Sequence, residues 1–290
     1  RSKRSSSTSS LFATIVSPEA LRERLDDPAL VVVDCRHALA DLALGRRLYD
    51  ESHVPGAFFA SVEDDLAGEK TGKNGRHPMP DPEVFARFLR GMGVDDATQI
   101  VAYDEGADIF AARLWFLCRW IGHDATAVLD GGFAAWNALG YPVTGAPSRT
   151  RREGHMTIRL RPELLVDAAF VAEHLGDPAM QLLDARARER YAGETEPIDP
   201  VAGHIPGAAH RWFEENFDGD GRLKSPQRLR EEFARAGLDP RRTVHQCGSG
   251  LSAAVTHLAM THAGLEGSRL YAGSWSEWCA DPSRPVETGS

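Results

Sequence analysis

Short apolar runs alternate with amphipathic segments along most of this chain. Residues 29–36 (ALVVVDCR) and 180–186 (MQLLDAR) are apolar runs of strand length, and each follows a segment whose apolar positions have helical spacing. Ser17 with Pro18 opens the first of those segments, a pair typical of a helix N-terminus. Strands that alternate with helices predict a largely parallel sheet covered by helices on both faces, which is the α/β class.

The whole pattern occurs twice, and the two copies are offset by roughly 150 residues. HVPGAFF at residues 53–59 matches HIPGAAH at 204–210, and VLDGGFAAW at 128–136 matches LYAGSWSEW at 270–278. Further blocks match in the same order, which chance does not easily produce. We therefore predict two similar α/β domains, each with its own parallel sheet.

Composition places the boundaries between these parts. A chain of 290 residues is long enough to favour two domains over one. The first residues, RSKRSSSTSS, are basic and serine-rich, which predicts a disordered tail and is also compatible with a piece of a transit peptide. The segment GAPSRTRREGHM is polar and turn-rich, as linkers are. We predict a tail over residues 1–11, a first domain over 12–143, a linker over 144–160 and a second domain over 161–286.

Charge and cysteine content exclude several classes of protein. The net charge of −9, with acidic residues spread along the chain, argues against a nucleic-acid or anionic membrane surface. No apolar run is long enough to span a membrane. The cysteines form no C-x-x-C pair, so we expect no disulfide framework, no zinc site and a reducing, cytoplasmic location. These cysteines are Cys35, Cys118, Cys247 and Cys279.

Cys247 lies in a glycine-rich loop between a predicted strand and a predicted helix. The strand ends near Val244, and the helix begins near Ser252, whose hydroxyl we expect to cap it. Gly248 and Gly250 allow positive φ, so backbone N–H groups can point inward, and the helix N-terminus adds the positive end of its dipole. Such a nest stabilises a thiolate, the form of cysteine that acts as a nucleophile.

The two halves differ at this position. Cys247 aligns with Asp104 of the first half, and a carboxylate cannot serve as a sulfur nucleophile. We therefore predict one active half and one supporting half, with the site in the cleft between them. We expect the other three cysteines to be small buried hydrophobes. A cysteine phosphatase would need an arginine six residues after the thiol, where this chain has Ala253.

Taken together, the HxPGA blocks, the D-x-R strand ends, the CGSGLS loop and the closing GSWSEW resemble the tandem-domain rhodanese family of sulfurtransferases. The resemblance covers about residues 12–285. It implies two rhodanese-like domains, no cofactor, and a Cys247 that takes a sulfane sulfur from a small-molecule donor and holds it as a persulfide. A thiol, a dithiol such as reduced thioredoxin, or cyanide would accept that sulfur. The alternative is a non-catalytic rhodanese-like binding module, although such modules tend to lose the cysteine.

The loop sequence also bears on the sulfur donor. Thiosulfate-using members carry two basic residues after the cysteine, whereas C-G-S-G is similar to the mercaptopyruvate sulfurtransferases. In that group the resemblance implies a proton relay formed by Ser249, His77 and Glu63. Glu63 stands where the family usually has aspartate. Asp64 and Asp65 are therefore rival candidates for the acidic member.

The resemblance also implies two arginines that hold the donor. Arg190, in ARERY, matches the first, while the second position falls near Asp199, where no arginine is present. Arg186 either contributes to the donor site or braces the structure, and His245 either tunes the thiolate or packs in the core. The predicted donor site thus combines Arg190 with loop residues, namely Gly248, Gly250, Leu251 and Ser252.

Overall fold

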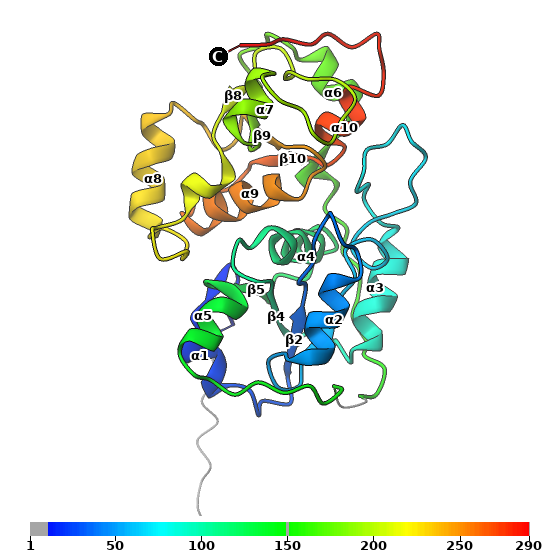
Figure 1. Ribbon diagram of the computed structural model, residues 1–290, viewed down its shortest axis with the longest axis vertical. Coiled ribbons are helices and arrows are strands. Elements are labelled where there is room, and N and C mark those ends of the chain that lie inside the picture. The colour runs from blue at the N-terminus through cyan, green and yellow to red at the C-terminus, as the bar shows by residue number, and fades with distance from the viewer. Residues whose placement is uncertain (1–10, 149–150, 290) are drawn as a thin grey trace, which may run out of the picture.

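The computed structural model describes residues 11–148 and 151–289, and within them the chain forms two lobes, each built around a five-stranded parallel sheet (Figure 1). The strand orders are β1-β5-β4-β2-β3 and β6-β10-β9-β7-β8, so the second sheet repeats the topology of the first. This confirms the predicted α/β class and the internal repeat. The tail predicted over residues 1–11 lies, apart from residue 11, outside the described residues.

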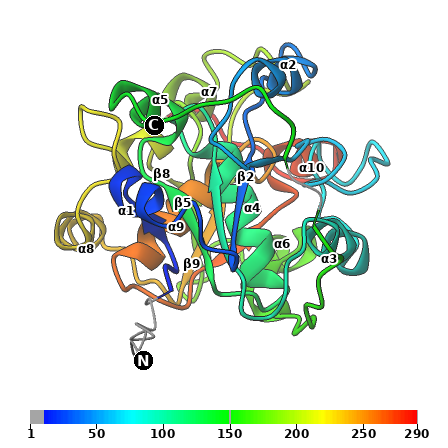
Figure 2. The ribbon, with the colours of Figure 1, turned by 90° about the horizontal axis from the view of Figure 1, so that it is seen from below.

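The N-terminal lobe contains five strands and five helices. Its strands are β1 (Ile15–Val16), β2 (Leu30–Asp34), β3 (Phe58–Phe59), β4 (Gln99–Tyr103) and β5 (Thr126–Leu129). Its helices are α1 (Pro18–Glu23), α2 (Leu44–Glu51), α3 (Pro82–Gly91), α4 (Ile109–Trp120) and α5 (Gly132–Ala138). Helices α1 and α5 lie on one side of β5 and β2, and α3 lies on the other (Figure 2).

The C-terminal lobe repeats this arrangement and adds two 3-10 turns. Its strands are β6 (Leu165–Val166), β7 (Gln181–Asp184), β8 (Ala209–His210), β9 (Thr243–Gln246) and β10 (Arg269–Tyr271). Its helices are α6 (Ala168–Glu173), α7 (Arg188–Ala192), α8 (Pro226–Arg235), α9 (Ser252–His262) and α10 (Ser274–Trp278), with the turns η1 (Pro162–Leu164) and η2 (Phe213–Asn216).

Helix starts follow the local sequence signals closely. Ser17 accepts a hydrogen bond from the N–H of Ala20, with Pro18 at the first helical position of α1. Asp81 caps α3 in the same way, again with proline next in the chain. A capping oxygen satisfies N–H groups that have no partner inside the helix, and proline has no N–H to lose there. The helix signals in the sequence were therefore sufficient for these elements.

Helices α4 and α9 join the two lobes. Both are apolar on nearly every face, and they pack against each other where the lobes meet (Figure 1). A helix that is hydrophobic all round must be buried, and here each helix is covered by its own sheet and by the other lobe. Because α4 and α9 follow β4 and β9 directly, the two strand-to-helix loops are brought to this boundary.

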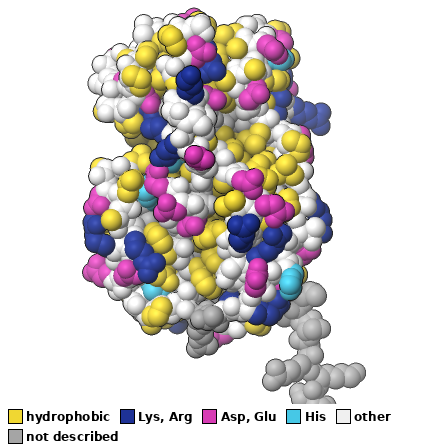
Figure 3. Space-filling view, turned by 90° about the vertical axis from the view of Figure 1, so that its right-hand side faces the viewer, with side chains coloured by type: hydrophobic (Ala, Val, Ile, Leu, Met, Phe, Trp, Pro, Cys, Tyr) yellow, Lys and Arg dark blue, Asp and Glu magenta, His cyan; other side chains and the backbone are white. Residues whose placement is uncertain are grey.

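The described part of the linker forms neither helix nor strand and runs along the N-terminal lobe. The N–H of Gly154 donates to the carbonyl of Arg90, and the N–H of Arg159 donates to that of Ile121. In the space-filling view, acidic and basic side chains are interspersed on the face shown, without a single-signed patch (Figure 3). Across the described ranges, no helix has the length and apolar character needed to cross a membrane.

Candidate active site

Cys247 begins the loop between β9 and α9 and is almost fully buried, with 2% of its surface exposed. Its Sγ accepts a hydrogen bond from the N–H of Gly250 at 3.1 Å. The start of α10 holds the cysteine backbone, since the Cys247 N–H donates to Ser274 Oγ at 3.1 Å and its carbonyl accepts from the N–H of Trp275 at 2.9 Å. Hydrogen bonds thus hold both the backbone of Cys247 and its sulfur in place.

The two loop glycines serve different purposes. Gly250 has φ of +77°, and a Cβ there would lie 2.5 Å from the carbonyl oxygen of Ala272, so only glycine fits. The prediction of positive φ at Gly248 is wrong. Gly248 instead leaves space for a neighbour, because a Cβ on it would lie 2.8 Å from Nη2 of Arg76.

The predicted cap of α9 is also wrong. The helix begins at Ser252 itself, Leu251 occupies the capping position, and no side chain there accepts from the helix. Ser252 already has helical geometry, whereas a capping residue must lie outside the helix in an extended conformation. The side chain of Leu251 is buried in the core shared by the two lobes. Ser252 is half-buried at the first helical position.

Ser249, His77 and Glu63 form one chain of hydrogen bonds, although they come from two lobes. Nδ1 of His77 lies 2.9 Å from Ser249 Oγ, and Nε2 of the same ring lies 2.9 Å from Glu63 Oε1. The two rival acids bond elsewhere: Asp64 accepts from the hydroxyl of Ser61, and Asp65 accepts from the backbone N–H of that residue. The structure therefore brings Glu63, rather than its neighbours, to the imidazole.

Burial decides the protonation state of His77. It lowers the pKa of the imidazole to about 4, and the hydrogen bond and charge of Glu63 oppose this only in part. Burial also opposes ionisation of Glu63, but hydrogen bonds from Lys70 and His77 outweigh it and leave the pKa of Glu63 lowered. A neutral imidazole beside a carboxylate donates through Nε2, which leaves Nδ1 to accept from the hydroxyl of Ser249.

Arg113 of α4 is a charged residue that sequence reasoning missed. Its guanidinium is fully buried and donates to the carbonyls of Leu66, His77 and Pro78 at 3.0–3.1 Å. Burial lowers the pKa of Arg113 to about 10, and the charge of Cys247 opposes that change. At neutral pH the guanidinium is therefore cationic and favours an anionic sulfur nearby. The one available signal was an arginine in the middle of the apolar run IFAARLWFLCRW.

Three further arginines lie near the loop of Cys247, with different partners. Arg186 holds both carboxylate oxygens of Asp184 and the carbonyl of Gly203, so it braces the end of β7. Arg190 lies at the mouth of the loop, as does Arg76 of the N-terminal lobe. Arg190 thus stands beside the loop as the sequence predicted. Arg76 was not expected there.

The remaining cysteines and His245 are packing residues. Cys35, Cys118 and Cys279 are all buried free thiols. The His245 ring lies edge-on to the His257 ring, with centroids 5.4 Å apart, and burial lowers the pKa of His245 to about 3. A neutral ring held in an apolar interior packs rather than tuning the thiolate.

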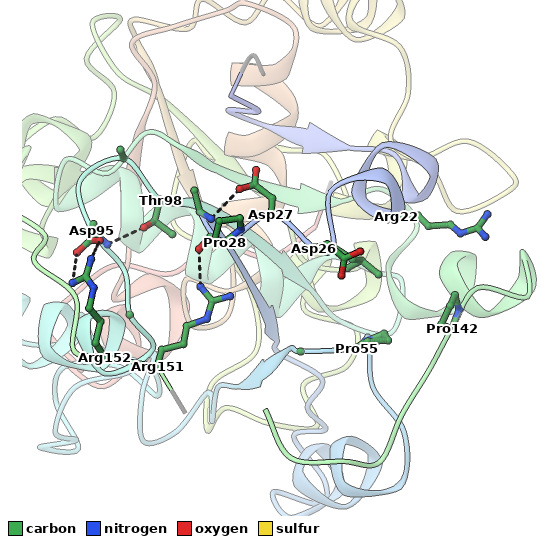
Figure 4. A pocket seen from close by; sticks show the side chains of 15 residues that line it. Arg22, Asp26, Asp27, Pro28, Pro55, Asp95, Thr98, Pro142, Arg151 and Arg152 are labelled. Carbon is green, nitrogen blue, oxygen red and sulfur yellow. Dashed lines mark hydrogen bonds and ion pairs between the residues drawn. The ribbon is translucent and has the colours of Figure 1, made fainter. Parts of the chain in front are cut away.

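A separate cavity of about 1050 Å³ lies at the amino ends of the N-terminal strands (Figure 4). Two of its three arginines already bond within the protein: Arg152 pairs with Asp95 at 2.5 Å, and Arg151 donates to two backbone carbonyls. Cys247 and its neighbours lie at the carboxyl end of a strand, where ligands of parallel sheets bind. We therefore place the candidate site at the Cys247 loop and not in this cavity.

The chain is similar to known proteins over nearly its whole length. The rhodanese-like domain family matches residues 17–139 and again 167–281. The chain is 46% identical over 281 residues to a probable 3-mercaptopyruvate sulfurtransferase of Pseudomonas aeruginosa, which covers 96% of this chain and 99% of the relative. It is 33% identical over 292 residues to a thiosulfate sulfurtransferase of Cricetulus griseus, covering 96% and 97% of the two chains.

Among solved structures, SseA from Escherichia coli, described as a 3-mercaptopyruvate sulfotransferase, superimposes with a TM-score of 0.79. The two chains are 29% identical, and the match covers 91% of this chain and 99% of the other. Both tandem lobes are therefore shared with a solved structure.

Proposed function

Because this chain belongs to the rhodanese family and is a sulfurtransferase, we propose that it moves a sulfane sulfur from 3-mercaptopyruvate to a thiol or cyanide through a persulfide on Cys247. The single observation that carries the choice of donor is the hydrogen-bonded chain of Ser249, His77 and Glu63 beside that cysteine. A relay of this kind serves a reaction that must move a proton.

In the first half-reaction, the Cys247 thiolate attacks the sulfur of 3-mercaptopyruvate and a new S–S bond forms. The C–S bond breaks, and its electron pair leaves on carbon as the enolate of pyruvate. The thiol proton of the donor must reach that carbon to give pyruvate. Ser249 and the neutral ring of His77 can take this proton and return it, while Glu63 fixes the tautomer of the imidazole.

Two groups would stabilise the negative sulfur before and after this step. The N–H of Gly250 points at Sγ, and the buried cation of Arg113 lies beneath the loop, 3.5 Å from the Gly250 carbonyl. Preorganised donors and charges in a dry site are more effective than the same groups in water. They would favour the thiolate and the persulfide anion alike.

In the second half-reaction, an acceptor attacks the outer sulfur and the Cys247 thiolate leaves. We expect a thiol, a dithiol such as reduced thioredoxin, or cyanide to act as acceptor. Because the cysteine is almost fully buried, the attacking atom must pass the side chains that surround its loop. The four free thiols of the chain motivate a cytoplasmic, reducing location as part of this proposal.

The test is kcat/KM with 3-mercaptopyruvate and with thiosulfate, measured with one acceptor, alongside Cys247→Ser. We expect mercaptopyruvate to be preferred by at least about 10-fold, which is about 1.4 kcal/mol of transition-state stabilisation. Cys247→Ser should form no persulfide with either donor. Turnover that survives in Cys247→Ser would overturn the mechanism.

Thiosulfate is the second candidate donor, because a relative with this activity in its name covers nearly the whole chain. Its reaction releases sulfite when the S–S bond breaks, and no proton is needed. Ser249→Ala therefore separates the two donors. We expect this variant to lose about 100-fold in kcat with mercaptopyruvate and to keep thiosulfate turnover within a few-fold. Equal losses with both donors would remove the argument for the relay.

A further inference from the structure

Two guanidinium groups from different lobes converge on the loop of Cys247. Arg190 comes from α7 of the C-terminal lobe, and Arg76 comes from the loop that carries His77 in the N-terminal lobe. A Cβ placed on Gly248 would lie 2.8 Å from Nη2 of Arg76 and 3.5 Å from both terminal nitrogens of Arg190. Both cations therefore stand directly over the backbone that follows the nucleophile.

Asp199 holds these two arginines together. One of its oxygens accepts from Nη1 of Arg76, and the other accepts from Nη2 of Arg190 at 3.1 Å. The Asp199 carboxylate is 4% exposed, so the ion pairs are shielded from water. Glu196 takes up Nε and Nη2 of Arg190 at 2.8–3.2 Å. The Arg190 guanidinium is thus held by several hydrogen bonds, and that of Arg76 by its pairing with Asp199, before any ligand arrives.

Each guanidinium keeps at least one terminal nitrogen that is not engaged. Within the part of the chain that the structure describes, Nη1 of Arg190 has no hydrogen-bond acceptor, and of the Arg76 guanidinium only Nη1 has one, which leaves Nη2 and Nε. Nη2 of Arg76 and Nη1 of Arg190 are also nitrogens that approach Gly248. Two fixed donors at the mouth of a thiol loop match the two oxygens of a carboxylate.

We infer that Arg76 and Arg190, braced by Asp199, form a clamp across the two lobes that binds the carboxylate of the donor. Arg76 is then a substrate-binding residue supplied by the lobe without the nucleophile, and Asp199 is a positioning residue. This inference rests on the proposed function, because it takes 3-mercaptopyruvate as the donor. It also accounts for a site that lacks the second arginine which the family pattern places near Asp199.

The charges of the clamp favour a planar monoanion. Asp199 and Glu196 balance the two arginines, so the cluster has little net charge and binds through directed hydrogen bonds. A carboxylate can satisfy both free nitrogens in one plane. The carboxylate end of the donor is then anchored at the Cys247 loop, so the clamp contributes to binding of the donor rather than to the chemical step.

The test compares Arg76→Met with Arg76→Lys and with Lys73→Met. Lys73 lies in the same loop, and its exposed side chain has no partner among the described residues, so its replacement controls for the loss of one positive charge. We expect Arg76→Met to raise KM for 3-mercaptopyruvate about 10- to 100-fold while kcat changes by less than about 3-fold. Arg76→Lys should lie between, because it keeps the charge and loses the fork. Lys73→Met should match the parent.

A binding measurement without chemistry completes the test. Pyruvate carries the same carboxylate and ketone, so its Kd for the Cys247→Ser protein, measured by calorimetry, should rise by the same factor when Arg76→Met is added. Asp199→Asn should raise this Kd about 10-fold, because one of the two accepting oxygens becomes an NH2 group, a donor that cannot bond to the guanidinium it faces. Unchanged KM and unchanged pyruvate affinity in Arg76→Met would overturn the clamp.

The two proposals fail separately. If the parent protein does not turn over mercaptopyruvate, the proposed function falls, yet Arg76-dependent binding of pyruvate would still support the clamp. If the parent turns over mercaptopyruvate and Arg76→Met binds pyruvate as tightly, the clamp falls and the proposed function stands. Circular dichroism of each variant verifies that it is folded before either conclusion is drawn.

Discussion

The loop of Cys247 and the matching loop at Asp104 have the same place in their lobes but hold different anions. The Asp104 carboxylate accepts four backbone N–H bonds at 2.9–3.3 Å, two of them from the first turn of α4. The Cys247 sulfur accepts one, from Gly250. A strand-to-helix loop of this kind is a nest for negative charge. In the N-terminal lobe the Asp104 carboxylate occupies this nest. In the C-terminal lobe the nest holds the Cys247 sulfur, to which the proposed mechanism adds a second sulfur atom.

This difference explains why one lobe holds the candidate nucleophile while the other supplies side chains around it. Asp104 is buried, and burial raises its pKa even though the loop N–H groups favour the charged form. With its own nest closed, the N-terminal lobe contributes side chains to the candidate site of the other lobe. Arg76, His77 and Arg113 reach toward the Cys247 loop, and Glu63 bonds to His77. The lobe without the nucleophilic cysteine thus still forms part of the candidate site.

The largest effect is expected when the Cys247 loop is given the carboxylate that the matching loop has at Asp104. Cys247→Asp should abolish persulfide formation, with a loss of at least about 1000-fold in turnover, or about 4 kcal/mol. The fold should survive, because a carboxylate suits a nest of N–H groups, as Asp104 demonstrates. Sulfur transfer by the variant and its thermal unfolding are the two measurements. Residual turnover above about one hundredth of the parent would mean that the sulfur is not the nucleophile.

Several features of the molecule could be predicted from the sequence. The repeat, the strand ends at Asp34 and Asp184, and the chain of Ser249, His77 and Glu63 were all accessible, because local patterns and a family resemblance carry them. Each is a statement about residue type at a fixed place in a repeating unit.

The residues that depend on docking of the lobes were not accessible. Arg76 and Arg113 make contacts across the boundary between the two lobes, and no local pattern encodes which side chains meet there. Positive φ at Gly248 and a cap at Ser252 failed for a different reason. Both inferences assumed an average loop, whereas this loop turns at Gly250 alone and begins its helix without a cap.

The second prediction removes the carboxylate from the loop of Asp104. Asp104→Ala removes the acceptor of four buried N–H groups, so we expect the free energy of unfolding to fall by about 3 kcal/mol. Asp104→Asn keeps one oxygen and should lose about half of that. Urea titration followed by circular dichroism measures both. A decrease below about 1 kcal/mol for Asp104→Ala would show that the carboxylate does not stabilise its loop.

The third prediction concerns His77 and Glu63, the residues of the N-terminal lobe that form a hydrogen-bonded chain with Ser249 of the Cys247 loop. Since burial lowers the pKa of His77 to about 4, the acid limb of kcat/KM with mercaptopyruvate should lie near pH 4 and not near 6.5. Below that pH the ring is protonated and cannot accept from Ser249. Glu63→Gln should lower kcat about 10-fold, and it should move the limb to lower pH, because the charge of Glu63 favours protonated His77.

Glu63→Asp is the matched variant for this experiment. It keeps the charge on a shorter side chain, so it should recover more activity than Glu63→Gln while leaving the acid limb closer to that of the parent. A limb that does not move in Glu63→Gln would mean that another group limits the rate at low pH.

The smallest predicted effect is on the free energy of unfolding, and it concerns the N-termini of the helices that follow the two loops. Neither α4 nor α9 has a side-chain cap at its own N-terminus, since Asp104 serves α4 from upstream and the Cys247 loop leads directly into α9. Ser252→Ala should therefore change the free energy of unfolding by less than about 0.5 kcal/mol, whereas Ser17→Ala, which removes a real cap, should lower it by about 1 kcal/mol. Urea titrations of the two variants, done side by side, measure this difference. A Ser252→Ala loss as large as that of Ser17→Ala would mean that the active loop depends on a capped helix after all, and the parallel with the Asp104 nest would then fail at the first turn of α9.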